Sequence, residues 1–245
     1  MAPRHSSGSR ILNVHHEAVR PVLFESDCRG YEYFGRGSSV LLATEKKLYW
    51  VTAAHVMVNQ DGSAETLRIF PRDTARTSLP FDIWVRIQSP EHDSDGLDLY
   101  ILRVDLKDFD ACMDSEAIAQ RVEDGLLDPS ELDADDELIV VGYPSTYRAI
   151  DYENLKINYR RSIYKTRFLG PSPIRNCYQL RFESGHSLGS FDGLSGGAVF
   201  RNVECGQFVL PVLTGILLRG TPMSGICHFV SAGALQHVLV RADTS

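Results

Sequence analysis

Short apolar or alternating runs, separated by glycine, aspartate and serine, recur along most of this chain. Alternation of apolar and polar residues is typical of half-buried strands, and many short strands joined by turns are typical of antiparallel barrels. The pattern predicts an all-β protein. Its clearest strands lie at residues 20–24, 39–43, 48–52, 81–87 and 98–104. We expect a first barrel over residues 19–112 and a second over residues 137–231.

Three stretches do not follow the strand pattern. Residues 1–18 are polar and basic, and we interpret them as a flexible tail. Residues 113–136 predict a helical and acidic linker between the barrels, with a helix over 115–122 capped by its first serine. Residues 232–245 predict a short C-terminal helix and tail, capped by the serine just before it. The barrels and this helix together form one predicted domain, 19–245.

Composition and charge narrow the function classes. The chain has 245 residues and a formal net charge of −7, so its overall charge does not attract nucleic acid. No apolar run is long enough to span a membrane, and residues 1–18 lack the apolar core of a secretory signal. The five cysteines are odd in number and scattered, which favours reduced thiols in a cytoplasmic protein. We expect no metal and no cofactor.

The most informative stretch is the glycine-rich sequence around Ser195, which precedes an apolar strand at residues 198–200. Glycine adopts backbone angles that other residues avoid. A Gly-x-Ser-Gly-Gly turn therefore has the freedom to direct the N–H groups of Gly193 and Ser195 to one point beside the serine hydroxyl. Acyl transfer needs a nucleophile next to such donors. The alternative is an ordinary glycine-rich turn.

A serine nucleophile needs a base, and the base needs a carboxylate that orients it. Of the eight histidines, His55 stands out because it follows an apolar strand and two small alanines. Asp98 begins another apolar strand, where a carboxylate without a partner would be costly. Asp93 and Asp95 lie in the polar stretch before it and are interpreted as solvated loop acids. The alternative for His55 is a core histidine.

These motifs resemble the chymotrypsin-like serine peptidases. The matching segments are Thr52-Ala53-Ala54-His55, Asp98-Leu99-Tyr100-Ile101-Leu102 and Gly193-Leu194-Ser195-Gly196-Gly197. The chain order of histidine, aspartate and serine is also that of the family, whereas other serine hydrolase folds use other orders. The resemblance implies two six-stranded antiparallel β-barrels of chymotrypsin type, with the active site in the cleft between them.

The resemblance also implies a role for each residue of the site. Ser195 would attack the scissile carbonyl, His55 would accept its proton, and Asp98 would orient His55. The N–H groups of Gly193 and Ser195 would form the oxyanion hole. The expected partner is a protein or peptide substrate.

Two departures from the secreted members of the family are informative. Leu194 stands where many of those enzymes carry the acid that pairs with a newly cut N-terminus, and Val56, Met57 and Val58 follow His55 where they carry a disulfide cysteine. The chain is therefore more similar to intracellular, HtrA-like members. We expect control by a partner protein, by oligomerisation or by ordering of residues 189–194.

The resemblance assigns substrate binding to Gly189, Leu217, Leu218, Arg219 and Gly220. Gly189 would form the floor of the pocket for the substrate residue before the scissile bond, and without an acid there a preference for lysine or arginine is not supported. Leu217 replaces the histidine of relatives that cleave after glutamate or glutamine. The set favours a small or apolar residue. Arg219 or His228, if turned inward, would instead favour an acidic one.

Two other function classes stay open from the sequence. A non-catalytic peptide-binding module would keep the barrels and use the cleft for recognition. A scaffold subunit would carry peptidase activity only incidentally. Reaction with a serine-directed probe discriminates a formed catalytic site from both.

Overall fold

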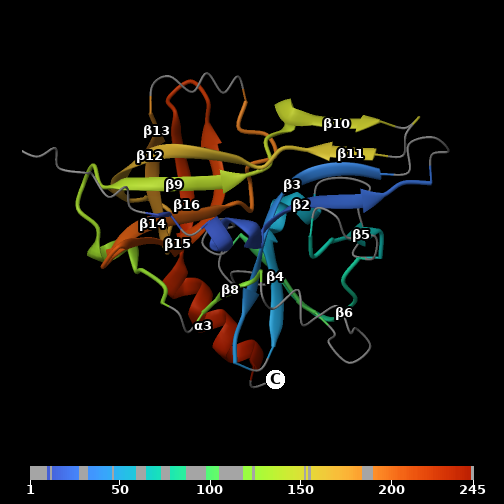
Figure 1. Cartoon of the computed structure of the whole chain (residues 1–245), viewed down its shortest axis with the longest axis horizontal. Helices are drawn as coiled ribbons and strands as arrows, with labels where there is room; N and C mark the ends of the chain where they lie inside the picture. Colours follow the sequence, from blue (N-terminus) through green and yellow to red (C-terminus); the bar gives the residue numbers. More distant parts are fainter. Residues whose placement is uncertain are drawn as a thin grey trace, which may run out of the picture.

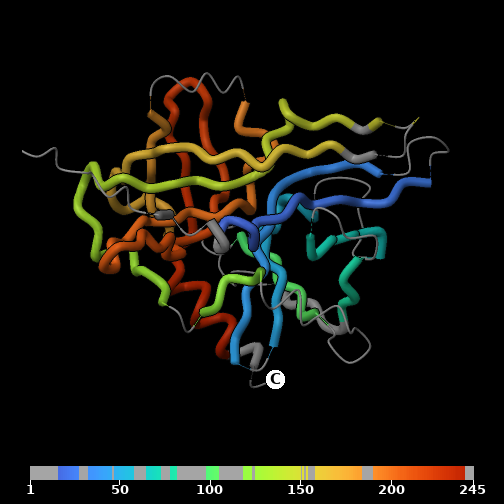
Figure 2. The backbone as a smooth tube through the Cα atoms, viewed as in Figure 1, coloured from blue at the N-terminus to red at the C-terminus, as the bar shows by residue number. Residues whose placement is uncertain are grey.

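Two curled, mainly antiparallel sheets contain most of the regular structure, as the computed structural model shows (Figure 1). The first half of the chain builds one sheet and the second half builds the other (Figure 2). The structure describes residues 10–11, 13–27, 33–45, 47–58, 65–72, 78–86, 98–104, 118–122, 125–151, 153, 156–183 and 190–243. The prediction of an all-β protein with a short C-terminal helix is confirmed.

The C-terminal sheet closes into a six-stranded barrel. Its strands pair in the order β14-β9-β12-β13-β16-β15, and β15 pairs back with β14. All six pairings are antiparallel. The strands are β9 (Glu137–Gly142), β12 (Ser162–Pro171), β13 (Cys177–Phe182), β14 (Ala198–Cys205), β15 (Phe208–Thr221) and β16 (Ile226–Ser231). One of the two expected barrels is therefore present.

Alternation of side chains explains why these residues close around a core. Along β12, Tyr164, Thr166 and Phe168 are buried while the residues between them are exposed, the period of two expected for a strand with one covered face. Phe229 on β16 is fully buried and packs against the rings of Phe168 and Tyr178, with centroids 6.4 and 6.0 Å away. Aromatic side chains thus fill much of the barrel.

The N-terminal sheet is a curled half-barrel. Its strands pair in the order β5-β2-β3-β4-β7-β6, and β8 pairs with β3. In the described ranges β5 and β6 are not paired with each other, so closure of a six-stranded first barrel stays a prediction. The strands are β2 (Val19–Glu25), β3 (Tyr33–Ala43), β4 (Leu48–Ala53), β5 (Leu67–Arg68), β6 (Phe81–Arg86), β7 (Leu99–Val104) and β8 (Gln120–Arg121).

A helix is expected over residues 115–122, but the structure has a strand at the C-terminal end of this stretch. Gln120 and Arg121 form β8, which runs parallel to β3, and residues 115–117 lie outside the described ranges. Ile118, Gln120 and Val122 are buried while Arg121 is exposed. Burial of every second residue is the pattern of a strand, and pairing with the backbone of β3 stabilises that conformation.

Part of the expected flexible tail is also structured. Residues Arg10–Ile11 form β1, parallel to β15, and Asn13–Ala18 form a 3-10 helix, η1. His16 is buried and packs on Phe200, with ring centroids 5.4 Å apart. Burial of this histidine against the barrel explains why the segment adopts one conformation despite its polar composition.

Short elements complete the fold. They are α1 (Ala54–Val58), η2 (Pro129–Glu131), η3 (Ser145–Tyr147), the pair β10 (Arg148–Asp151) and β11 (Lys156–Tyr159), and α3 (Ala232–Asp243). The hydroxyl of Ser231 accepts the Ala234 N–H at 3.1 Å, so the predicted cap of the C-terminal helix is present. None of the helices in the described ranges is long and apolar enough to cross a membrane.

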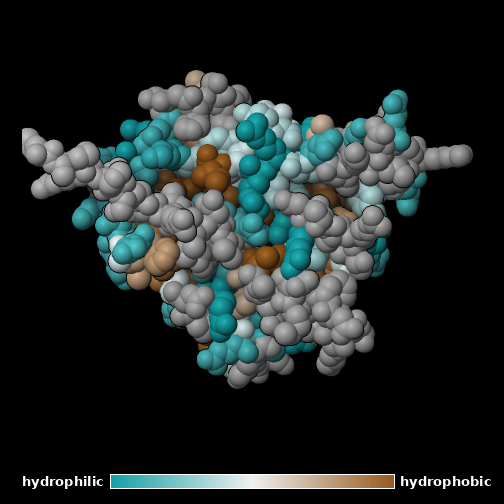
Figure 3. All heavy atoms as spheres, in the orientation of Figure 1, coloured by the Kyte–Doolittle hydropathy of each residue, from teal (hydrophilic) through white to brown (hydrophobic). Residues whose placement is uncertain are grey.

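The two sheets share a continuous hydrophobic cluster that includes Val40 and Trp50 on the N-terminal side and Val141 and Phe200 on the C-terminal side. On the face drawn in Figure 3, a band of hydrophilic residues covers the middle of the molecule, where Figure 1 has the sheets meeting. The two halves are therefore joined by buried apolar contacts beneath a polar surface.

The barrel core predicts a clear stability difference between two phenylalanines. Phe229→Ala removes a fully buried ring and should lower the free energy of unfolding by about 3–5 kcal/mol. Phe208→Ala is the matched control, because that ring is 48% exposed and its loss should cost less than about 1 kcal/mol. Urea denaturation followed by fluorescence measures both, and equal losses would contradict this account of the core.

Candidate active site

His55 and Asp98 meet because their strands are paired neighbours. His55 lies in α1, directly after β4, and Asp98 directly precedes β7, which is antiparallel to β4 with Ala53 opposite Leu99. The Asp98 carboxylate accepts the backbone N–H of His55 at 3.0 Å through Oδ1 and bonds the His55 ring nitrogen Nδ1 through Oδ2. The Asp98 carbonyl accepts the Ala54 N–H at 2.9 Å. The histidine is therefore held through both backbone and ring.

This pairing orients the imidazole ring. The side chain of Asp98 is 12% exposed and that of His55 is 34% exposed, so the carboxylate lies behind the ring and the ring borders solvent. A carboxylate on Nδ1 favours the tautomer in which Nδ1 carries the proton. The other nitrogen, Nε2, is then available to accept a proton.

Ser195 lies in a tight turn, residues 191–197, that we call the Ser195 turn. Gly193 and Gly196 have φ angles of +87° and +84°, which residues other than glycine rarely adopt. A Cβ on Gly196 would lie 2.0 Å from the Ser38 carbonyl oxygen and 2.2 Å from the Thr52 hydroxyl. Glycine is thus required at position 196 both for its backbone angle and for the close approach of β3 and β4.

Leu194 anchors the Ser195 turn. Its side chain is fully buried in the barrel's hydrophobic cluster. Its N–H donates to the Phe191 carbonyl at 3.0 Å and its carbonyl accepts the Gly197 N–H at 2.9 Å. The position that carries an acid in many secreted peptidases is thus held here by apolar packing.

The peptide between Asp192 and Gly193 has a defined orientation. The Asp192 carbonyl accepts the Ser145 N–H at 2.8 Å, and the described chain contains no cis peptide bond. Because a trans peptide directs its C=O and N–H to opposite sides, the Gly193 N–H points away from Ser145.

Ser38 connects the Ser195 turn to the N-terminal sheet, and sequence reasoning missed it. Its hydroxyl donates to the Gly193 carbonyl at 2.6 Å and accepts the Tyr143 N–H at 2.8 Å. Its N–H donates to the Ser195 carbonyl at 2.8 Å, and its carbonyl accepts the Thr52 hydroxyl at 2.7 Å. The signal in the sequence is weak: a pair of serines directly before the apolar residues 40–43.

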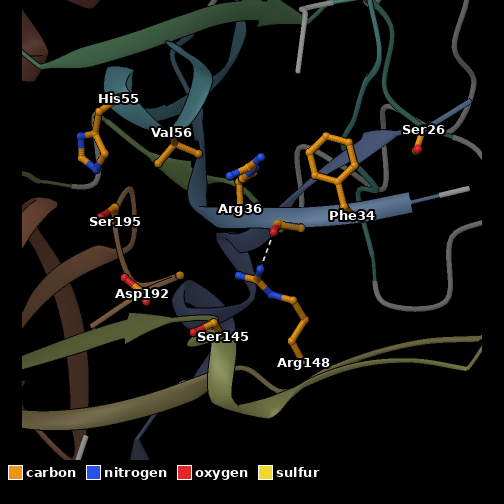
Figure 4. A pocket seen from close by; sticks show the side chains of 11 residues that line it. Ser26, Phe34, Arg36, His55, Val56, Ser145, Arg148, Asp192 and Ser195 are labelled. Carbon is orange, nitrogen blue, oxygen red and sulfur yellow. Dashed lines mark hydrogen bonds between the residues drawn. The ribbon is translucent and has the colours of Figure 1, made fainter. Parts of the chain in front are cut away.

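A pocket of about 730 Å³, which we call the Ser195 pocket, opens between the two sheets (Figure 4). His55, Val56 and Ser195 lie at one end, and Figure 4 shows the Ser195 side chain below the His55 ring. The other described lining residues are Ser26, Phe34, Gly35, Arg36, Ser145, Arg148, Asp192 and Gly193. Residues far apart in the chain thus share one cavity.

Four of the five residues expected to bind substrate lie in the described ranges. Gly189 is outside the described ranges. Leu217 and Leu218 are buried, with exposed fractions of 1% and 0%, so neither residue is open to a ligand. Arg219 is exposed and Gly220 is half-buried. None of the four described residues is among those that line the Ser195 pocket.

The space beside Gly220 is filled. A Cβ on Gly220 would lie 2.0 Å from the Cys227 sulfur and 2.9 Å from the Phe191 ring. Phe191 also packs on Phe182, with ring centroids 4.8 Å apart. Burial raises the pKa of the Cys227 thiol to about 12, so this sulfur stays protonated and unreactive at neutral pH.

His228 does not reach the Ser195 pocket. Its Nδ1 pairs with the Ser172 hydroxyl at 2.9 Å, on the strand pair β13–β16. Burial lowers the pKa of His228, and the nearby Arg219 guanidinium lowers it further. The neutral imidazole is therefore favoured, and this residue is not positioned to read an acidic substrate at Ser195.

No protein-family model matches the chain, and no curated protein is similar to it.

We predict that substitution by alanine destabilises the protein more at Gly196, in the Ser195 turn, than at Gly206. Gly196→Ala should destabilise the protein by about 3–5 kcal/mol, because the methyl group meets backbone and the φ angle is positive. Gly206→Ala is the matched control, since its φ is +63° and nothing lies within 4 Å, and should cost only about 1–2 kcal/mol. Equal unfolding free energies for the two variants would refute the steric argument.

We predict that removal of the Ser38 hydroxyl loosens the Ser195 turn. Ser38→Ala leaves the Gly193 carbonyl and the Tyr143 N–H without their buried partner, a cost of about 1–3 kcal/mol for each such group. Amide hydrogen exchange over residues 190–198 should quicken. Ser39→Ala is the control, because the buried Ser39 hydroxyl donates only to the Arg20 carbonyl. Unchanged amide hydrogen exchange in Ser38→Ala would mean that the Ser195 turn keeps its conformation without the Ser38 hydroxyl.

Proposed function

We propose that this chain is a chymotrypsin-like serine endopeptidase. The observation that carries the proposal is the His55–Asp98 pairing at a pocket that also contains Ser195. A closed six-stranded barrel beside a curled half-barrel is compatible with that fold. Motif order along the chain adds further support, because histidine, aspartate and serine follow the order of this class of peptidase.

In this proposal Ser195 Oγ attacks the carbonyl carbon of the scissile peptide bond. His55 Nε2 takes the hydroxyl proton as the C–O bond forms. Asp98 keeps Nδ1 protonated and stabilises the imidazolium. The two bonds from the Asp98 carboxylate, to the His55 backbone and ring, support this role because they fix the position of the ring before substrate arrives.

The negative charge that develops on the carbonyl oxygen needs donors. We assign these to the N–H groups of Gly193 and Ser195. The orientation of the Asp192–Gly193 peptide supports this assignment, because its carbonyl is occupied by Ser145 and its N–H is directed to the other side. A flipped peptide would instead direct a carbonyl oxygen toward the developing charge.

The second half of the reaction reverses the proton transfer. The imidazolium of His55 gives its proton to the leaving amine as the C–N bond breaks, which leaves an ester on Ser195. Water then attacks the ester, His55 takes a proton from that water and returns it to Ser195, and the free carboxylate leaves. The mechanism requires no metal and no cofactor.

The proposal also covers substrate and setting. The filled space beside Gly220 favours a small residue before the scissile bond, because Phe191 and Cys227 already occupy that side. The free thiols of Cys205 and Cys227 are compatible with the proposed reduced, cytoplasmic compartment. Control by a protein partner or by ordering of residues 189–194 belongs to the same proposal.

Labelling with a fluorophosphonate tests the proposed function. The probe should label the wild-type chain at Ser195. Ser195→Ala should abolish labelling, and His55→Ala should slow it by about 10²–10⁴-fold because the base is lost. Intact-mass spectrometry measures both the rate and the site.

Ser172 and His228 provide the matched control. They form a serine–histidine hydrogen bond on the barrel, outside the Ser195 pocket. Ser172→Ala and His228→Ala should label at the wild-type rate. Absence of labelling in the wild type, with the fold intact, would reject the peptidase and favour a peptide-binding module or scaffold.

A further inference from the structure

We propose that the Ser195 pocket selects substrates with an aspartate or glutamate among the first residues after the scissile bond. This inference rests on the proposed peptidase function and names a substrate class for it. Two arginine side chains, from separate segments of the chain, carry it: Arg36 on β3 and Arg148 at the start of β10.

The direction of the substrate follows from His55. In the proposed reaction His55 protonates the leaving amine, so the residues attached to that amine lie on the histidine side of Ser195. The Ser195 pocket begins at His55 and Val56 and continues to Phe34 and Arg36 on β3 (Figure 4). β15, the strand expected to contact the other half of the substrate, contributes none of its described lining residues.

Arg36 is held as a recognition group. Its guanidinium lies over the Phe34 ring, 5.3 Å from the ring centroid, and the side chain is half-buried. Stacking on an aromatic face restricts the orientation of a guanidinium. A planar, always charged fork of this kind matches the geometry of a carboxylate.

Arg148 adds a second positive charge to the Ser195 pocket and bonds the backbone of β3. Its guanidinium donates to the Gly35 carbonyl (Figure 4) and lies 5.7 Å from the Tyr159 ring centroid. Burial lowers the pKa of Arg148, Tyr159 and Asp192 act in the opposite direction, and Arg36 adds to the lowering. Both arginines line the same pocket, so a carboxylate bound there lies near two positive charges.

The charge balance of the pocket favours an anion. Among its described lining residues the two arginines outnumber the single carboxylate, Asp192, whose residue is exposed to solvent. The whole chain, in contrast, carries a net charge of −7. Excess positive charge among the described lining residues, in a protein that is negative overall, favours acidic segments at this position.

Sequencing of cleavage products tests this inference. A peptide library, randomised throughout and amidated at the C-terminus so that only side chains carry carboxylates, is digested and the new N-termini are sequenced. Aspartate and glutamate should be enriched over asparagine and glutamine at one of the first positions. Arg36→Gln should lower this ratio by about fivefold, and high salt should lower it in the wild type.

Charge reversal separates recognition from a structural role. Arg36→Glu should shift the preference at the same position toward lysine and arginine, a result that simple loss of packing does not produce. Arg160→Gln is the matched control, because Arg160 stacks on Tyr147 at 5.6 Å in the same manner but does not line the Ser195 pocket. Its acid-to-amide ratio should equal that of the wild type.

Two outcomes distinguish this inference from the proposed function. Efficient cleavage with equal ratios for acids and amides overturns the cationic subsite and leaves the peptidase intact. If neither cleavage nor fluorophosphonate labelling occurs, the peptidase fails. Fluorescence anisotropy with the Ser195→Ala chain then decides the subsite alone: tighter binding of an Asp/Glu peptide than of its Asn/Gln isostere supports it, and equal binding overturns it.

Discussion

The buried contacts of Ser38 are the constraint on which the candidate site depends. Through its backbone and hydroxyl this residue bonds Gly193, Ser195, Tyr143 and Thr52, which belong to both halves of the molecule. Hydrogen bonds in a buried site are costly to leave unmade. The two sheets therefore have one favoured relative position, and that position sets Ser195 opposite His55.

Apolar packing and the backbone geometry of glycine position the Ser195 turn. Leu194 sits in the barrel core, and Gly196 allows β3 and β4 to approach closely. The Ser195 turn is thus anchored in the barrel by a buried apolar side chain, which takes its place when the barrel folds.

The sequence allowed the candidate catalytic residues to be predicted because each lies at the end of a strand with a clear local pattern. His55 follows β4, Asp98 precedes β7 and Ser195 precedes β14. Ser38 and Arg148 could not be predicted in the same way, because their partners are more than a hundred residues away in the chain. The same reason explains β8, whose strand conformation depends on β3, and Leu218, whose apolar character reflected the core rather than a substrate pocket.

The order of elements along the chain has a consequence for biosynthesis. His55 and Asp98 flank strands of the N-terminal sheet, which is translated first, whereas Ser195 precedes β14, β15 and β16, without which the C-terminal barrel cannot close. Domains form from the N-terminus as the chain emerges from the ribosome. The Ser195 turn therefore gains its complete barrel surroundings only after β16 has left the exit tunnel. In the peptidase that we propose, the order of the strands alone would keep an incomplete chain inactive toward neighbouring nascent proteins.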